Sequence, residues 1–341
     1  WGTWIYIQDM RKKGKSSAYA TWSAAQQPIP GEADDAHVSF FAHMAVFKRT
    51  QNDLTTTMEV TVAPEDPLEI RRIHLINNAA STRHLRLTSY GEVILSQQAA
   101  DMRHPAYNTL FIESEYVPDL NLLIFEHRKR RDAKEPLFLG HMLVTNETRL
   151  RRNEKLPVGY ETDRRAFIGR EHNARGPYAL QSKTYLTGST GSTLDPVFAL
   201  GREIHLRAHD TFSLAYLTFT AHSREALLKL AQRYRAWSRI EDAFLESSVA
   251  NLIWLGRHKI DRDTLKLNLD LLSLLVYPNG QKRAEAETLS RNVLNQAGLW
   301  RLGISGDYPI ILLEINDPQQ LNLLVEVVQA QSFLRSRGFN A

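Results

Sequence analysis

The fold class is decided by Leu54-Thr-Thr-Thr-Met-Glu-Val-Thr-Val62, in which polar residues, mostly threonine, alternate with apolar ones. Residues 68–76 follow, with charged residues alternating with leucine and isoleucine. Successive side chains of a β-strand point to opposite faces, so a period of two is typical of a strand with one buried face. Both segments are therefore predicted to be half-buried strands.

The same pattern extends on both sides of this pair. No helical pattern interrupts it up to Thr145, and two closing strands are expected after the glycine-rich turn at 188–192. Parallel strands need long crossovers, usually helices, so the sheets must be antiparallel and stacked as a large β-sandwich. The other strands are expected at 1–9, 19–23, 38–49, 85–95, 110–117, 122–128, 137–145, 199–206 and 212–220.

The period changes to that of a helix at Ser223, a favoured N-cap residue. Further helices are expected at 238–255, 264–276, where helical neighbours outweigh a strand-like alternation of leucines, and 283–297. In the last helix Asp317 is the cap, Pro318 stands first, Gln320 completes a capping box and Gly338 ends it. Five helical segments are too few for a closed barrel of six helix pairs, so we expect an incomplete helical layer.

These patterns predict two domains, a β-sandwich at 1–221 and a helical region at 222–341. The chain begins at Trp1 without a methionine, already in strand-like sequence, and ends at Ala341 just after a helix stop signal. We therefore expect a piece of a larger polypeptide, with the helical region truncated at its C-terminus.

Composition narrows the function classes. The net charge of +4 comes from 42 basic and 38 acidic residues, which does not indicate nucleic-acid binding. Cysteine is absent, which excludes disulfides and thiol catalysis and fits a reducing compartment. The longest apolar run, 271–277, is far shorter than the ~18 residues of a membrane span, so no membrane insertion is expected.

The richest polar stretch is Tyr160-Glu-Thr-Asp-Arg-Arg-Ala-Phe-Ile-Gly-Arg170. If residues 161–168 are extended, Glu161 and Asp163 share one face with Arg165. That face could be a buried ion-pair ladder, a site of chemistry, or a contact for a sugar or a neighbouring domain.

The arginines of this stretch are expected to hold carboxylates, since a guanidinium binds a carboxylate through two parallel hydrogen bonds. Their predicted partners are Glu161, Asp163 or Asp195, which would tie the strand to the Leu194-Asp-Pro196 turn. The same polar groups are the carbohydrate-binding candidates, together with a tryptophan that either stacks on a sugar or lies in the core. The candidates are Trp22, Glu161, Asp163, Arg164 and Arg170.

Three further patterns are candidates for catalysis or metal binding. Glu161 and Asp163 could act as the acid and base of glycosyl transfer, which needs two carboxyls about 5 to 9.5 Å apart, but any strand residues i and i+2 meet that spacing. Asp307 stands where a nucleophile elbow needs glycine, so Gly303-Ile-Ser-Gly-Asp307 is interpreted as a turn. His205 and His209 have metal-like spacing only on a helix, so neither metal nor cofactor is expected. Asp163 and Asp307 remain the catalytic candidates.

A series of short segments, taken in chain order, points to a family. In this combination the chain resembles the cyclic β-1,2-glucan synthases over essentially its whole length. These are very large bacterial inner-membrane polypeptides that combine a glycosyltransferase, a transglycosylating barrel and a region related to the cellobiose phosphorylases. The segments are Trp1-Gly-Thr-Trp-Ile-Tyr-Ile-Gln-Asp9, Trp22-Ser23 with Gln27-Pro28, Thr88-Ser-Tyr90, Glu92-Val93, Glu161-Thr-Asp-Arg164, Phe167-Ile-Gly-Arg170, Leu194-Asp-Pro196, Ser223-Arg-Glu-Ala226 and Gly303-Ile-Ser-Gly-Asp307 with Pro309.

The resemblance implies an antiparallel β-supersandwich followed by helices, the earlier of the family's copies, upstream of the phosphorylase-type barrel. The family's general acid and phosphate-binding residues lie in that (α/α)6 barrel, and no counterpart of its motif occurs here. The leading hypothesis is therefore a non-catalytic carbohydrate-contacting or scaffolding module. The alternatives are an active inverting phosphorylase-type domain that uses Asp163 or Asp307, and an interaction scaffold without sugar affinity.

The resemblance also implies the setting of this module. The parent enzyme would synthesise, cyclise and trim β-1,2-glucan on the cytoplasmic side of the bacterial inner membrane. The expected partners are β-glucan and neighbouring domains of the same polypeptide.

Overall fold

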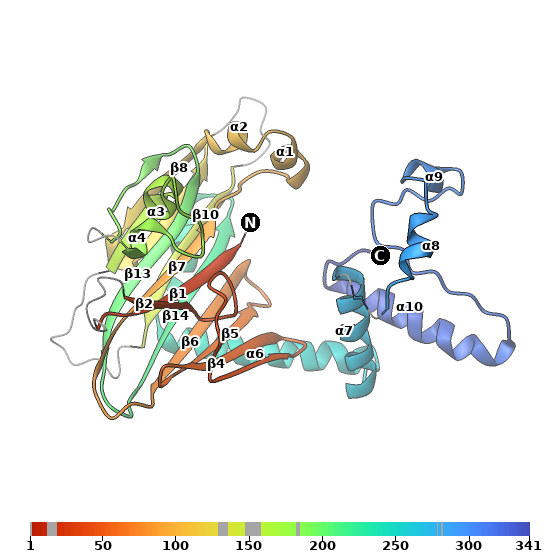
Figure 1. Cartoon of the computed structure of the whole chain (residues 1–341), viewed down its shortest axis with the longest axis horizontal. Coiled ribbons are helices and arrows are strands. Elements are labelled where there is room, and N and C mark those ends of the chain that lie inside the picture. The colour runs from red at the N-terminus through yellow and green to blue at the C-terminus, as the bar shows by residue number, and fades with distance from the viewer. Residues whose placement is uncertain are drawn as a thin grey trace. The chain divides into compact units, whose positions relative to one another are not determined.

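The structure is a computed structural model that describes residues 2–11, 19–128, 136–146, 158–181, 185–277, 279–280 and 282–341. The chain divides into two compact units, Trp1–Asn251, here the sheet unit, and Leu252–Ala341, here the helical unit. The sheet unit occupies the red-to-turquoise part of the chain in Figure 1 and contains every strand that the structure describes.

Two antiparallel sheets make up the sheet unit. One has five strands in the order β11-β13-β7-β1-β2, and the other has nine in the order β12-β8-β9-β10-β14-β6-β5-β4-β3. The antiparallel β-sandwich followed by helices is thus confirmed. The strands are β1 (Thr3–Asp9), β2 (Ala20–Ser23), β3 (Asp35–Phe40), β4 (Met44–Gln51), β5 (Leu54–Val62), β6 (Leu68–Asn77), β7 (Arg83–Glu92), β8 (Ile112–Val117), β9 (Leu122–His127), β10 (Phe138–Thr145), β11 (Val158–Asp163), β12 (Gly191–Ser192), β13 (Pro196–Leu206) and β14 (Thr211–Ala221).

The main core lies between the sheets. Leu54 and Met58 of β5 contribute to it together with Ile73 and Leu75 of β6, and their partners include Leu87 on the five-stranded sheet. Burying each such side chain contributes about 1.5 to 3 kcal/mol. The period of two in β5 and β6 is therefore explained by one face packed against the second sheet.

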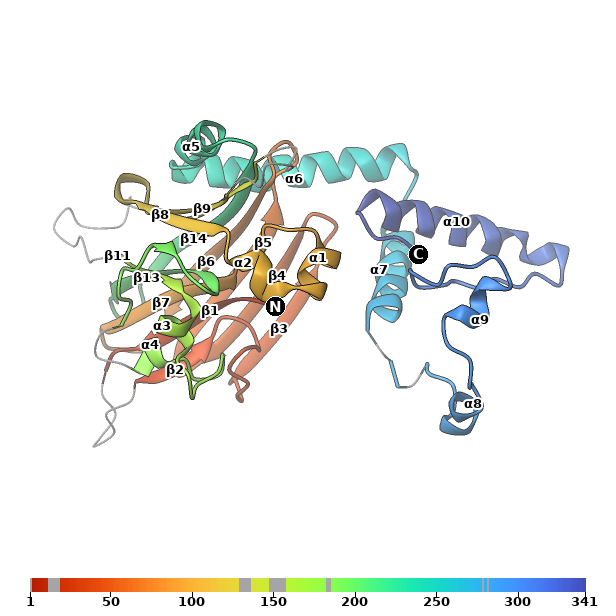
Figure 2. The ribbon, with the colours of Figure 1, turned by 90° about the horizontal axis from the view of Figure 1, so that it is seen from above.

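The outer face of the nine-stranded sheet is covered by α5 (Arg224–Arg233) and the first part of α6 (Trp237–Arg257). Figure 2 shows both helices along that side of the sandwich. Ser223 caps α5 as predicted, because its hydroxyl accepts the backbone N–H of Ala226 at 3.1 Å. Leu227 and Ala231 are fully buried on this face, so the helix is held by its apolar stripe.

The outer face of the five-stranded sheet carries a smaller core. Tyr6 of β1 and Tyr90 of β7 pack there against Phe167 and Ile168 of α3 (Arg164–Ile168) and Leu180 of α4 (Tyr178–Gln181). The rings of Tyr90 and Phe167 lie 4.8 Å apart. This layer fixes the start of α3, which borders the candidate site below.

Several predictions for the sheet region are wrong in detail. The segment 38–49 is not one strand but the hairpin of β3 and β4, paired in antiparallel register. No helix was predicted before residue 145, but three short helical elements lie there. They are α1 (Gln98–Arg103), α2 (Pro105–Thr109) and the 3-10 turn η1 (Pro118–Leu120). Helices of five or six residues are too short to show a helical period.

In the helical unit, α7 (Arg262–Val276) confirms the helix expected at 264–276. The helix expected at 283–297 is reduced to α8 (Ala286–Ser290), whose residues are all exposed, and α9 (Ala297–Trp300) follows. Asp317 caps the turn η3 (Pro318–Gln320), and α10 (Leu321–Ser336) comes directly after it. Within the described residues these helices form no closed ring of six pairs.

Gly338 ends α10 as predicted, whereas the capping box expected at the start of this helix is altered. Gly338 has a φ of 79°, the left-handed conformation in which glycine commonly ends a helix. The Gln320 side chain accepts the backbone N–H of Asn316 at 3.1 Å, one residue before the N–H that a capping box would use. The 3-10 turn between the cap and α10 accounts for that shift.

Candidate functional site

The central polar stretch is a strand that ends in a helix cap. β11 stops at Asp163, and α3 begins at the next residue. The Asp163 carboxylate accepts the backbone N–H of Arg165 at 2.8 Å. Aspartate is favoured at this position because it satisfies an amide that the helix leaves free. The extended conformation considered for residues 161–168 is thus found only as far as Asp163.

Glu161 is buried, with 1% of its surface exposed, and its carboxylate is surrounded by donors. One oxygen accepts the backbone N–H groups of Thr162 at 2.9 Å and Asp163 at 3.0 Å, and also the hydroxyl of Ser189. The other accepts the backbone N–H of Thr187 at 3.2 Å and its hydroxyl at 2.5 Å. These five bonds leave Glu161 little capacity for a ligand and tie β11 to residues 187–189.

The other sequence candidates lie apart from one another. Trp22 is 2% exposed within the core between the sheets, so neither face of its ring is open to a sugar. Arg170 is exposed, and none of the described residues forms an ion pair with it. Asp307 belongs to the helical unit, is exposed, and accepts a hydrogen bond from Nε2 of Gln296 at 2.9 Å.

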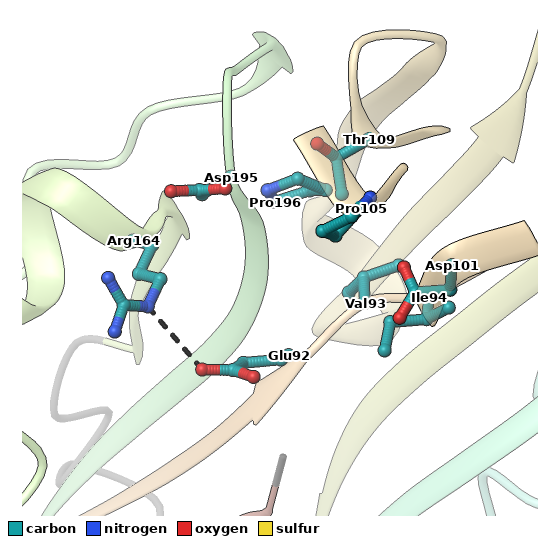
Figure 3. Close-up of a pocket in the computed structure, with 9 residues that line it drawn as sticks. All are labelled: Glu92, Val93, Ile94, Asp101, Pro105, Thr109, Arg164, Asp195 and Pro196. Atoms are coloured by element: carbon teal, nitrogen blue, oxygen red, sulfur yellow. Dashed lines mark hydrogen bonds and ion pairs between the residues drawn. The ribbon is translucent and has the colours of Figure 1, made fainter. Parts of the chain in front are cut away.

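Arg164 is the sequence candidate that lines a cavity. The cavity has a volume of about 250 Å³ and lies where the end of β7 meets α1, α2, the start of α3 and the start of β13. Figure 3 shows Arg164, Glu92 and Asp195 on one side and Asp101, Ile94 and Val93 on the other. We call it the Asp101 cavity. Its lining residues are Glu92, Val93, Ile94, Asp101, Pro105, Thr109, Arg164, Asp195 and Pro196.

Strand pairing brings these distant segments together. β13 pairs with β7 so that Val197 stands opposite Glu92, and the N–H of Val93 donates to the carbonyl of Pro196 at 3.0 Å. The backbone N–H of Arg164 donates to the carbonyl of Asp195 at 3.0 Å. The predicted tie between this stretch and the 194–196 turn is thus made by backbone atoms.

Three carboxylates and one guanidinium set the charge of the Asp101 cavity. Nε of Arg164 lies 3.4 Å from Oε1 of Glu92, which replaces the predicted partners of this arginine. Asp195 is exposed at the rim, whereas Asp101 is only 2% exposed. No hydrogen bond or ion pair reaches the Asp101 carboxylate from any residue that the structure describes. The cavity is therefore acceptor-rich and carries more negative than positive charge.

Replacing Arg164 with alanine is expected to lower the free energy of unfolding by less than about 1 kcal/mol. Its side chain is 46% exposed and that of Glu92 is 25% exposed, and such pairs are screened by water. Urea denaturation of wild type and Arg164→Ala measures the change. A loss of about 3 kcal/mol or more would show that Arg164 forms the buried ion pair expected from the sequence.

The two histidines with metal-like spacing lie in β13 and in the turn that follows it. The described residues contain no group of three or more His, Cys, Asp or Glu side chains that could hold an ion. His205 packs against His84 with ring centroids 4.5 Å apart, and His84 contacts Glu203 at 2.7 Å. His209 lies in the turn after β13 with a φ of 57°. His205 and His209 are thus not on a helix, where their spacing would place both rings on one face.

Sequence reasoning missed Asp101 and the role of Glu92. Asp101 lies in α1, which shows no periodic signal, and nothing in its neighbours marks it. Glu92-Val93, Glu161-Thr-Asp-Arg164 and Leu194-Asp-Pro196 are three of the segments that carried the family resemblance, and all three contribute to the Asp101 cavity. Because all three segments carried the family resemblance, they could have been predicted to lie close together in the fold.

Comparisons with known proteins agree with the fold. Residues 1–237 match the family model described as glycosyl hydrolase 94, supersandwich domain. The chain is 30% identical over 340 residues to the cyclic β-(1,2)-glucan synthase NdvB of Rhizobium meliloti (strain 1021), a match covering 100% of this chain and 12% of that protein. It is 25% identical over 185 residues to the solabiose phosphorylase of Paenibacillus borealis, covering 54% of this chain and 22% of that protein.

Among solved structures, a bacterial glucoamylase complexed with acarbose aligns with a TM-score of 0.42 and 13% identity, covering 72% of this chain and 30% of that chain. A putative kojibiose phosphorylase from the human microbiome aligns with a TM-score of 0.41 and 8% identity, covering 74% of this chain and 27% of that chain.

The chain thus spans only a small part of the curated relatives that it matches. Within the described residues, no helix has both the length and the apolar character needed to cross a bilayer. The resemblance to the cyclic β-1,2-glucan synthases, first drawn from short segments, is confirmed by the identity along the whole chain. Since the family model covers both sheets and α5, the chain belongs to the glycosyl hydrolase 94 supersandwich domain family.

Proposed function

We propose that this chain is a non-catalytic, carbohydrate-contacting module of a polypeptide that synthesises, cyclises or trims β-1,2-glucan. The observation that carries the proposal is the 30% identity along the whole chain to a cyclic β-(1,2)-glucan synthase. β-Glucan and neighbouring domains of the same polypeptide are the proposed partners, on the cytoplasmic side of the inner membrane. The domain boundary after residue 221 remains part of this proposal.

The absence of catalysis is proposed from the way the acidic candidates are used. Cleavage of a glycosidic bond needs two carboxyls that flank it, one of them able to donate a proton. Glu161 accepts five hydrogen bonds, and Asp163 holds the first turn of α3. Asp307 belongs to the other unit. These contacts support the proposal that Glu161 and Asp163 stabilise the fold and do not act as an acid and base.

Contact with neighbouring domains is the second part of the proposal, and α10 favours it. Leu321, Val325 and Val328 of this helix are all more than half exposed. Exposed apolar patches of this kind are typical of interaction surfaces. An interaction scaffold without sugar affinity would use the same surface. The carbohydrate-contacting module and this scaffold therefore differ only in whether the chain binds glucan.

Incubating the chain with linear β-1,2-glucan and inorganic phosphate tests the non-catalytic assignment. We expect no glucose 1-phosphate and no shortening of the glucan, because Glu161 and Asp163 are held by backbone and hydroxyl donors of the protein and Asp307 belongs to the other unit. The matched reactions contain Asp163→Asn and Asp307→Asn. Release of glucose 1-phosphate by wild type that either substitution abolishes would establish the phosphorylase alternative instead.

A further inference from the structure

We propose that the Asp101 cavity binds the terminal sugar unit of a β-linked glucan, with Asp101 and Asp195 accepting its hydroxyl groups. The inference rests on the proposed carbohydrate-contacting function and gives it a site. Arg164 stands at the rim as a hydrogen-bond donor to the same sugar.

The Asp101 carboxylate is the group around which the proposed site is built. It is 98% buried, lines the cavity, and has no hydrogen-bond or ion-pair partner among the described residues. Buried polar groups in proteins are almost always paired, so an unpaired one calls for an explanation. Burying a charge without a partner is unfavourable. A ligand that supplies the missing donors from within the cavity explains why this arrangement persists.

The charge of the cavity decides which donors fit. Glu92, Asp101 and Asp195 face a single guanidinium, so an anion such as phosphate would be repelled. The described residues contain no cluster suited to a metal ion. The two oxygens of a carboxylate can accept hydrogen bonds from two neighbouring hydroxyl groups, and a sugar ring carries several adjacent hydroxyls. Neutral, hydroxyl-rich ligands therefore match the acceptors without adding charge.

The remaining walls are apolar. Val93, Ile94, Pro105 and Pro196 line the cavity between the polar groups. Small-molecule sites combine such apolar surface with a few placed polar groups, and the C–H face of a sugar ring fits this surface. The apolar walls match the C–H face of a glucopyranose ring, and the carboxylates match the hydroxyls around its edge.

The size of the cavity limits how much of a glucan enters. Its 250 Å³ lies just below the range of about 300 to 1,000 Å³ that is typical of ligand pockets. One sugar unit is therefore expected inside, and the exposed Asp195 and Arg164 mark the opening from which a chain would extend.

The test is calorimetric titration of the 341-residue chain with a β-1,2-linked glucose disaccharide and with linear β-1,2-glucan. Asp101→Asn is expected to weaken binding of both ligands at least about tenfold, a loss of about 1.4 kcal/mol. Asp195→Asn, at an exposed position, is expected to weaken binding without affecting folding. The matched control is Glu65→Gln, an exposed carboxylate in the β5–β6 turn outside the cavity, which should bind as wild type does.

Melting temperature separates a ligand site from a structural role. Without sugar, Asp101→Asn should keep or raise the melting temperature, by up to about 2 to 4 °C, since it removes an unpaired buried charge. A lower melting temperature together with wild-type affinity per folded molecule would mean that Asp101 is structural and would overturn the proposal.

Three further outcomes are distinguishable. If wild type binds glucan and Asp101→Asn binds it equally, this inference fails while the proposed function stands. If wild type binds neither ligand, the carbohydrate-contacting function itself fails. If N-acetyl-lysine methylamide, but not the disaccharide, raises the melting temperature of wild type and not of Asp101→Asn, the cavity holds a lysine of a neighbouring domain and the proposal is overturned.

Discussion

Glu161→Ala is expected to destabilise the sheet unit by at least about 3 kcal/mol. The buried carboxylate accepts the backbone N–H groups of Thr162, Asp163 and Thr187 and two hydroxyls. Each buried donor that loses its acceptor costs about 1 to 3 kcal/mol, and alanine can replace none of these bonds. Urea denaturation followed by tryptophan fluorescence measures the change in the free energy of unfolding.

The matched control is Asp163→Asn, two residues along the same stretch. Asparagine caps helices about as well as aspartate, so the free energy of unfolding should change by less than about 1 kcal/mol. If Glu161→Ala instead melts like wild type and loses affinity for β-1,2-glucan, Glu161 contacts sugar and the structural interpretation is wrong.

His141 is expected to make the fold less stable as the pH falls below about 6.5. It is 1% exposed in β10, with Nε2 2.8 Å from the hydroxyl of Ser89 and Nδ1 3.0 Å from that of Thr218. Burial, followed by the charge of Arg71, lowers the pKa of His141 from 6.5 to about 3. The imidazole is therefore neutral in the folded protein at a pH where the unfolded chain binds a proton.

The sign of the effect follows from linkage. Above pH 6.5 both states are neutral at this position and the full stability is present. Between pH 6.5 and about 3 the unfolded state binds one more proton than the folded state, so stability falls by about 1.4 kcal/mol per pH unit. Below the folded pKa no further loss comes from His141.

Urea denaturation between pH 6.5 and 5 measures this slope. The window avoids Glu59, whose pKa is lowered to about 2 because its hydrogen bonds to His74 and Arg72 outweigh the effect of burial. The Glu59 contribution is lost only as the pH falls from about 4.5 toward 2. His141→Gln should flatten the slope, whereas His37→Gln, at an exposed position in β3, should leave it unchanged. Equal slopes in wild type and His141→Gln would contradict the assignment.

The sheets could be predicted because local alternation reports which face of a strand is buried. β5 and β6 were predicted within a residue of their observed ends, and the cap at Ser223 followed from one side chain. The hairpin of β3 and β4 was merged into one strand, since its turn at 41–43 contains no proline or glycine. The local pattern therefore predicts most strands and misses turns without such markers.

The Asp101 cavity could not be predicted from local sequence patterns, because its residues are brought together by strands that are far apart in the chain. Within the 161–170 stretch, Arg164 lines the Asp101 cavity, while Glu161 and Asp163 serve the backbone around them. The partner of Arg164 is Glu92, which the pairing of β7 with β13 brings beside the start of β13. Asp101 comes from a helix of six residues without a periodic signal. Its unpaired state is a property of the packed structure alone.

The carbohydrate-contacting function is tested most directly by isothermal titration of the wild-type chain with linear β-1,2-glucan, in buffer without phosphate. We expect saturable binding in the millimolar range, with the glucan recovered at its original chain length. A titration that shows only heats of dilution up to saturating glucan would contradict the carbohydrate-contacting function and leave an interaction scaffold without sugar affinity.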